Sequence, residues 1–115
     1  MPEELENQSA LYKIIGERAR LLILTHLAAS RQPVSFNELK ATLDLTAGNL
    51  SMHLKMLTDS DLVTIEKKFV NNKPLTTAEI TEIGRSALEE YLTDMENMIQ
   101  NLKKKLAEGG QNGTH

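Results

Sequence analysis

Hydrophobic positions along the chain repeat with two different periods, which divide it into helical stretches and one extended stretch. The helical period predicts helices over residues 3–15, 17–29, 36–43, 46–59 and 81–106. Between residues 62 and 80 the pattern is that of two strands joined by a turn. We therefore expect a mainly α fold with a small β-hairpin, an α+β protein.

The two short helices in the middle of the chain carry clear start signals. Ser35 followed by Glu38 matches a capping box at the first of them, and Thr46 is a candidate N-cap of the second. In the second helix leucine recurs at positions 50, 54 and 57, which predicts its buried face. Two short helices about three residues apart are typical of a helix-turn-helix, whose second helix reads DNA.

A hairpin is predicted directly after this pair. Residues 62–70 are rich in β-branched and apolar side chains; the odd-numbered ones from Val63 to Lys67 share one face, and the even-numbered ones from Thr64 to Lys68 the other. Residues 71–74 have turn chemistry, and residues 75–80 are expected to form the returning strand.

The last helix carries the longest pattern. Its apolar positions are spaced 4-3-4-3-4, as in the a and d positions of a coiled coil: Leu88, Leu92, Met95, Ile99, Leu102 and Leu106. A helix of this size is about 37 Å long, more than a small core can cover. We therefore expect its outer end to pair with a second copy of the chain. The chain then divides into a winged helix-turn-helix domain (1–80), a dimerisation helix (81–107) and a disordered tail (108–115).

Composition narrows the class of protein. The chain has no cysteine, which excludes disulfides and thiolate metal sites, and no apolar run long enough to cross a bilayer. Its acidic N-terminus lacks the features of a secretion signal, so we expect a cytoplasmic protein. The net charge is −3, but residues 12–73 carry nine Lys and Arg against six Asp and Glu, while both flanks are acidic. This basic middle permits contact with phosphates.

The candidate DNA-contacting residues lie on the helix over 46–59 and on the hairpin. On a helical wheel the positions away from its leucine face are occupied by small, amide, thioether and basic side chains, which suit the major groove: Thr46, Gly48, Asn49, Ser51, Met52 and Lys55. His53 falls near the buried boundary and is a candidate either for a phosphate contact or for a half-buried packing residue. On the hairpin Lys67, Lys68 and Lys73 could bind phosphates; we favour Lys68 and Lys73 because they lie next to the tip. Arg18, Arg20 and Lys40 are weaker candidates.

The stretch Gly-Asn-Leu-Ser-Met-His-Leu-Lys-Met-Leu at residues 48–57, followed by Asp61-Leu62-Val63, resembles the recognition helix of winged helix-turn-helix regulators of the ArsR/MarR superfamily. The resemblance extends over roughly residues 20–92 and implies a DNA-binding regulator with a hairpin wing. The chain departs from the pattern at Met52, where a basic or polar residue is common, and at Ser60-Asp61, where the family usually has a small residue and a glycine. The wing tip has one lysine and no arginine.

Other function classes have less support. The overall acidity favours, as the alternative, a winged-helix module that binds proteins and does not read DNA. An enzyme is not expected, because the sequence pairs no nucleophile with a base and has no phosphate-cradling glycine loop. We expect neither a cofactor nor a metal, because the last helix offers carboxylates without histidine, His26 reads as solvated and His115 lies in the tail. No residue pattern identifies a small-molecule effector.

Overall fold

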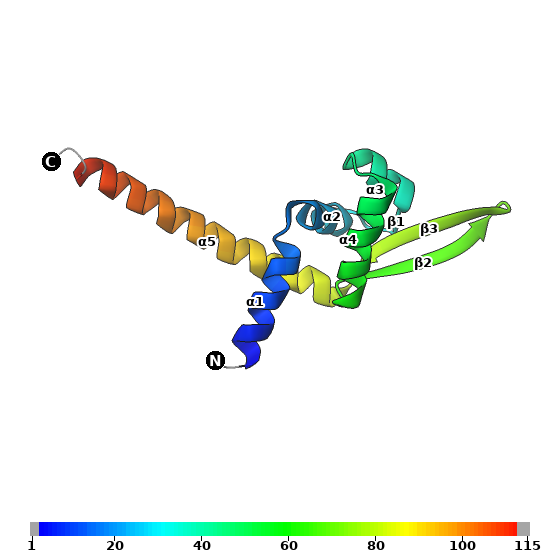
Figure 1. Ribbon diagram of the computed structural model, residues 1–115, viewed down its shortest axis with the longest axis horizontal. Coiled ribbons are helices and arrows are strands. Elements are labelled where there is room, and N and C mark those ends of the chain that lie inside the picture. Colours follow the sequence, from blue (N-terminus) through cyan, green and yellow to red (C-terminus); the bar gives the residue numbers. More distant parts are fainter. Residues whose placement is uncertain (1–2, 113–115) are drawn as a thin grey trace.

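The computed structural model describes the backbone of residues 3–112 and the side chains of residues 8–109. The described residues form five helices, α1 (Glu3–Ile15), α2 (Arg18–Ala29), α3 (Phe36–Thr42), α4 (Ala47–Asp59) and α5 (Glu82–Asn112), and three strands, β1 (Val34–Ser35), β2 (Val63–Val70) and β3 (Lys73–Ile80) (Figure 1). The expected order of helices with one hairpin is confirmed, and so is the mainly α class.

Four of these helices begin at a side chain that accepts a hydrogen bond from their first turn. The oxygens of Glu17, Ser35, Thr46 and Thr81 lie 2.8–3.1 Å from backbone nitrogens of α2, α3, α4 and α5. Each such cap contributes about 1 kcal/mol by satisfying a donor that the helix leaves unpaired. The predicted caps Ser35 and Thr46 are therefore confirmed.

The sheet is antiparallel with the strand order β1-β3-β2. In the hairpin Val63 pairs with Ile80 and Val70 with Lys73, which leaves only Asn71 and Asn72 in the turn. Both asparagines have positive φ, 54° and 64°, as a two-residue hairpin turn of type I′ requires. The predicted four-residue turn over 71–74 is thus too long. Strand β1 was missed because two residues carry no period.

The core lies between α2, α4, the sheet and the first turns of α5. Its largest fully buried side chains are all aliphatic: Ile15, Ile23, Leu24, Leu39, Leu50, Leu57 and Leu62. We call this part of the molecule, together with α1 and α3, the body. Its packing determines which face of α4 and which face of the hairpin remain exposed.

Helix α5 leaves the body on the side opposite to the hairpin and gives the molecule an elongated shape (Figure 1). The extents are 71 × 34 × 25 Å and the radius of gyration is 18.1 Å, against about 13 Å for a compact chain of this length. Helix α5 continues to Asn112, beyond the end at residue 107 that the sequence predicted; the disorder expected over residues 108–115 stays a prediction. Residues 113–115 lie outside the described residues. Along the described chain, no helix combines the length and hydrophobicity needed to span a bilayer.

Candidate nucleic-acid interface

The first two turns of α4 are exposed on the side away from the core. The residues predicted to read DNA on this helix, His53 apart, are all exposed: Thr46, Gly48, Asn49, Ser51, Met52 and Lys55. The leucines at 50, 54 and 57 are buried as expected. A side chain built at Gly48 would meet no atom within 4 Å, so the backbone of α4 can be approached closely there.

His53 is buried inside the body, which agrees with the packing alternative and does not fit a contact with DNA. Its Nδ1 atom lies 3.1 Å from Nη1 of Arg20 and 3.5 Å from Oε2 of Glu17. Glu17 is the N-cap of α2, and Arg20 lies in the first turn of that helix. Arg20 is also buried and donates from Nε to the carbonyl of Ile14. Arg20 is therefore excluded as a phosphate contact as well. Together Glu17, Arg20 and His53 form a polar cluster that joins α4 to α2.

The carboxylate of Glu17 is stabilised in its charged form. Burial alone would raise its pKa, but hydrogen bonds from the backbone N–H groups of Ala19 and Arg20, and the charges of His53 and Arg20, lower the pKa below its usual value. The same carboxylate caps α2, so the cap and the cluster depend on one ionised group. The polar cluster is thus a structural feature and lies away from the exposed face of α4.

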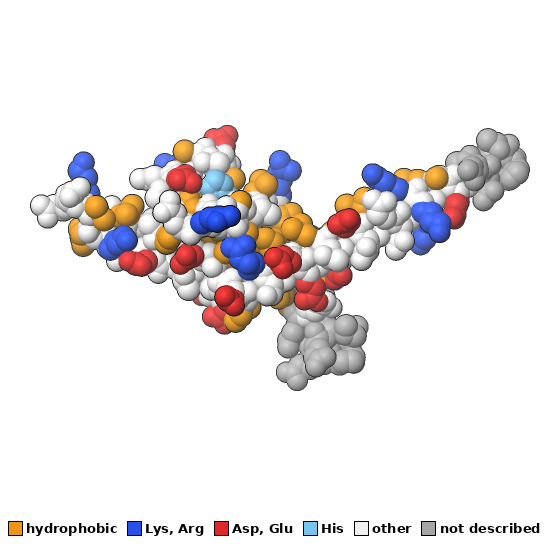
Figure 2. Space-filling view, turned by 180° about the vertical axis from the view of Figure 1, so that it is seen from behind, with side chains coloured by type: hydrophobic (Ala, Val, Ile, Leu, Met, Phe, Trp, Pro, Cys, Tyr) orange, Lys and Arg blue, Asp and Glu red, His pale blue; other side chains and the backbone are white. Residues whose placement is uncertain are grey.

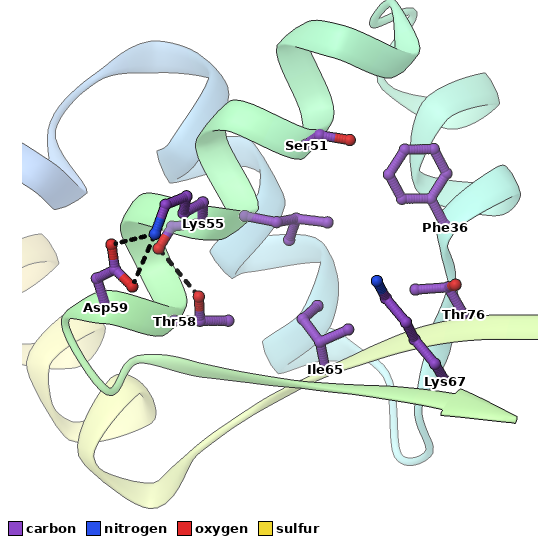
Figure 3. Close-up of a pocket in the computed structure, with 9 residues that line it drawn as sticks. Phe36, Ser51, Lys55, Thr58, Asp59, Ile65, Lys67 and Thr76 are labelled. Atoms are coloured by element: carbon purple, nitrogen blue, oxygen red, sulfur yellow. Dashed lines mark hydrogen bonds and ion pairs between the residues drawn. The ribbon is translucent and has the colours of Figure 1, made fainter.

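A groove of about 420 Å³ runs between α4 and the base of the hairpin (Figure 3). The groove is lined by apolar side chains, hydroxyl groups, two ammonium groups and one carboxylate. The lining residues are Phe36, Ser51, Leu54, Lys55, Thr58, Asp59, Ile65, Lys67 and Thr76. Hydroxyl and ammonium donors are the side chains that usually contact DNA phosphates. The positive charge of the groove is partly neutralised, because Lys55 Nζ lies 3.1 Å from Asp59 Oδ2.

The hairpin directs Lys67, and not Lys68, toward this groove. Lys67 shares the face of Ile65 and extends along the groove in Figure 3. Lys68 lies on the opposite face of β2, because side chains alternate along a strand, and its Nζ lies 3.7 Å from Glu66. Lys73 pairs with Val70, also on that opposite face. The preference for Lys68 and Lys73 over Lys67 therefore does not fit the geometry.

The signal for Lys67 was present in the sequence. Counting in twos from the apolar Val63 and Ile65 leads to Lys67, so strand alternation already set this lysine on the core-side face. Proximity to the tip was the weaker criterion. The cluster of Glu17, Arg20 and His53 had no comparable signal, since Arg20 and His53 are 33 residues apart.

The turn from α4 into β2 keeps its shape without the usual glycine. Asp61 has a φ of 62°, a conformation that glycine adopts most readily and Asp tolerates. Its carbonyl accepts a hydrogen bond from the hydroxyl of Thr81, the cap of α5. The departure at Ser60-Asp61 thus leaves the hairpin in its expected place.

The predicted apolar stripe of α5 is exposed after Leu88 except at Met95, which is half-buried. Leu88 is only 3% exposed and belongs to the core of the body, so its prediction as an interface residue is wrong. Leu92, Ile99, Leu102 and Leu106 are exposed. In Figure 2 hydrophobic side chains follow one edge of α5, with basic and acidic ones beside them.

Helix α1 covers the adjacent flank of α5. The rings of Tyr12 and Tyr91 meet edge to face at 5.1 Å, and Gln8 donates to Glu90 at 3.0 Å. Tyr12 donates a hydrogen bond to Asp94; burial and then this bond raise the pKa of Tyr12 to about 12, so its hydroxyl stays protonated. The start of α5 is thus anchored to α1 while its apolar stripe remains open.

His26 is half-buried and lies 2.9 Å from Glu38 of α3, so its prediction as a solvated residue is wrong. This contact joins α2 to α3, the first helix of the helix-turn-helix. In the described part of the chain, no three His, Asp or Glu side chains lie close enough together to hold a metal ion.

Comparison with known proteins gives consistent matches. The family model of the winged helix DNA-binding domain matches residues 19–99. An uncharacterised protein of Methanocaldococcus jannaschii is 33% identical over 91 residues, which cover 79% of this chain and 98% of that protein.

Among solved structures, a transcriptional regulator homologue from Pyrococcus horikoshii OT3 has a TM-score of 0.74 and 32% identity, covering 88% of this chain and 98% of that one. A protein assigned to the MarR family of transcriptional regulators, from Enterococcus faecalis V583, has a TM-score of 0.69 at 22% identity, covering 94% of each chain. At that identity the second likeness concerns the fold alone.

Proposed function

Because this chain belongs to the winged helix DNA-binding domain family, we propose that it is a transcriptional regulator that binds specific double-stranded DNA as a homodimer. In this proposal α4 enters the major groove and the hairpin contacts the flanking backbone. The observation that carries it is the exposed start of α4, where small, amide and hydroxyl side chains face outward and a Cβ atom at Gly48 would meet nothing within 4 Å.

The major-groove contacts come from the first two turns of α4. Asn49 can pair with adenine through two hydrogen bonds, and Ser51 can donate or accept. Gly48 lets the backbone approach the bases, and the exposed thioether of Met52 offers an apolar contact to a thymine methyl group. These few contacts provide specificity for one half-site only.

Phosphate contacts come from the groove between α4 and the hairpin. Lys67 supplies a charge there and Thr58 and Ser51 supply hydroxyls, while Lys55 shares its charge with Asp59. Because few lysines take part, affinity depends only moderately on salt. Lys68 and Lys73 remain available for contacts outside the groove.

The second copy binds through α5, because the exposed leucines of its stripe need a covering surface. In the resulting homodimer the two α4 helices are related by a twofold axis. Two recognition helices then address half-sites about one helical turn, roughly 34 Å, apart. The role in transcription is supported by the Pyrococcus relative, which is a transcriptional regulator homologue at 32% identity.

The test is selection of bound duplexes from random DNA by the purified full chain. The expected result is enrichment of a short inverted repeat at physiological salt. Asn49→Ala should weaken binding to that repeat by about tenfold or more and relax the preference at one base pair of each half-site. Asn97→Ala, an exposed asparagine on α5, is the matched control and should leave the binding unchanged.

If no sequence is enriched over bulk DNA, the proposal is wrong. That result would favour the alternative, a winged-helix module that binds a protein. The net charge of −3 and the Lys55–Asp59 pair both support this alternative, because they reduce attraction to DNA. Under that alternative Asn49→Ala would leave the function unchanged, and variants in the α5 stripe would abolish it.

A further inference from the structure

The far end of the hairpin carries apolar side chains that stand largely in solvent. We call residues 69–74 the hairpin tip. Phe69 is 76% exposed and Val70 45%, and Pro74 is exposed as well. The tip extends well beyond α3 and α4 (Figure 1). An aromatic ring this exposed contributes little to folding, whereas a partner that removed it from water would gain the free energy of its burial.

The ring of Phe69 lies on the face of the hairpin that borders α4. Side chains alternate along β2, so Ile65, Lys67 and Phe69 share one face, and the first two of them line the groove beside α4. Pro74 lies directly opposite Phe69 in the register and therefore shares this face. From the body to the tip the face is apolar, then basic, then apolar again.

The hairpin tip is surrounded by positive charge. Residues 67–75 carry three lysines and no acid, in a chain whose net charge is −3. Figure 2 shows basic side chains beside hydrophobic ones at this end of the molecule. An apolar surface with a basic rim fits a partner that combines anionic groups with an apolar interior. The minor groove of DNA is such a partner, because phosphates border it while sugars and base edges line it.

The hairpin is long enough to reach the minor groove that flanks the site of α4. The turn begins at Asn71, six residues beyond Ile65, which corresponds to roughly 20 Å at about 3.3 Å per residue. With α4 in the major groove, the flanking minor groove is half a helical turn away, about 17 Å. Strand pairing continues to Val70 and Lys73, so the position of the Phe69 ring is fixed by the sheet.

From this placement we propose that Phe69 is an apolar wedge that enters the flanking minor groove and partly unstacks one base step, with Pro74 against the sugars. This inference rests on the proposed function and deepens it. The tip has no arginine, the side chain that commonly enters a narrow minor groove. An inserted apolar side chain acts differently, because it kinks the duplex by about 20–90°.

The wedge gives the protein a sequence preference at a position that α4 does not contact. Pyrimidine–purine steps such as TA and CA are the easiest to unstack and kink. A selected inverted repeat should therefore carry such a step about five base pairs outside the centre of each half-site, half a helical turn away.

The bend is measured by energy transfer between dyes on the two ends of the selected duplex, with the full chain bound. The wild type should bend the duplex. Phe69→Ala should reduce the bend and weaken binding by roughly tenfold, as expected for the loss of one aromatic contact with a base. Phe69→Leu, which keeps an apolar wedge, should keep most of the bend.

Val70→Ala is the matched control, because Val70 is exposed at the same tip but lies on the opposite face of β2. It should leave both the bend and the affinity unchanged. Since Phe69 is largely exposed, Phe69→Ala should melt at the same temperature as the wild type. A duplex that stays straight with the wild type, or an equal bend with Phe69→Ala, would overturn the inference.

A second measurement reports on the base step itself. The adenines of the flanking sequence are replaced one at a time by 2-aminopurine, whose fluorescence rises when the base loses its stacking. The wild type should raise the fluorescence at one flanking step of each half-site, and Phe69→Ala should not. Unchanged fluorescence at every flanking position would contradict the insertion of the ring.

These outcomes separate the inference from the proposed function. If no sequence is enriched from random DNA, the proposed function is wrong, and the inference fails with it. If a repeat is enriched and Asn49→Ala weakens its binding, while Phe69→Ala changes neither bend nor affinity, the proposed function stands. In that case only the wedge is overturned, and a protein partner becomes the better candidate for the hairpin tip.

Discussion

At the scale of single residues, Gly84 permits the closest approach between α5 and the rest of the body. A Cβ atom at this position would lie 2.2 Å from the carbonyl oxygen of Leu62 and 3.0 Å from Cγ1 of Ile80. Gly84→Ala should therefore lower the free energy of unfolding by about 1–3 kcal/mol, the usual cost of overpacking. Urea unfolding at fixed protein concentration measures it.

Gly48→Ala is the matched control, because a Cβ atom there meets nothing within 4 Å. In a helix this exchange is expected to raise the free energy of unfolding by roughly 0.5–1 kcal/mol. Equal effects of the two substitutions would contradict the close packing of α5 on Leu62.

Glu17 is the residue whose ionisation links helix capping to the buried cluster. Its pKa is lowered in the folded chain, so its charged form stabilises the fold at pH values above the unfolded pKa. That stabilisation is lost as the pH falls through the folded pKa. The difference in melting temperature between wild type and Glu17→Gln should be constant near neutral pH and shrink as the pH falls through the lowered pKa of the folded chain.

Melting curves at a series of pH values measure this difference. A difference that stays the same throughout the acid range would mean that the Glu17 carboxylate is not stabilised by Arg20, His53 and the first turn of α2. Glu38→Gln is a suitable control for acid effects on an exposed carboxylate that contacts a histidine.

At the scale of elements, the hairpin separates two neighbouring lysines onto opposite faces. Under the proposed function Lys67→Ala should weaken binding uniformly across DNA sequences and reduce the slope of log affinity against log salt by about 0.9, the value for one phosphate contact. Lys68→Ala, paired with Glu66 on the other face, should change the slope less. Binding titrations at several salt concentrations compare the two, and equal slopes would contradict the orientation of Lys67 toward bound DNA.

Helix α4 illustrates how far periodicity carries a prediction. Its cap at Thr46 and its leucine face were predicted from spacings of three, four and seven residues. His53 was placed at the boundary of that face and proved buried, because Arg20 and Glu17 from α2 cover it. A helical wheel contains no information on what another helix covers.

At the scale of the whole molecule, α5 extends far beyond the core, and its exposed stripe is the basis of the proposed homodimer. Leu102→Asp should leave the body folded, because Leu102 is half exposed in the single chain, and should yield a monomer. Affinity for the inverted repeat should then fall by roughly 10²–10⁴-fold, the gain that linked binding of two half-sites provides. Sedimentation and DNA titration measure the two effects.

Asn97→Asp, on the opposite side of α5, controls for the added charge. It should leave both the dimer mass in sedimentation and the affinity for the inverted repeat unchanged. A Leu102→Asp chain that stays dimeric would place the interface elsewhere on the molecule. A monomer with undiminished DNA affinity would contradict the need for two copies.

Local patterns were enough for the order of elements, the caps at Ser35 and Thr46, the leucine face of α4 and the heptad spacing of the stripe on α5. These features depend on residues at most a few turns apart, where backbone geometry and side-chain spacing determine the outcome. Contacts between distant segments decided the rest: the burial of His53 by Arg20, the orientation of Lys67 toward α4, and the covering of Leu88 by the body. Burial depends on which surfaces meet, and that is a property of the folded chain as a whole.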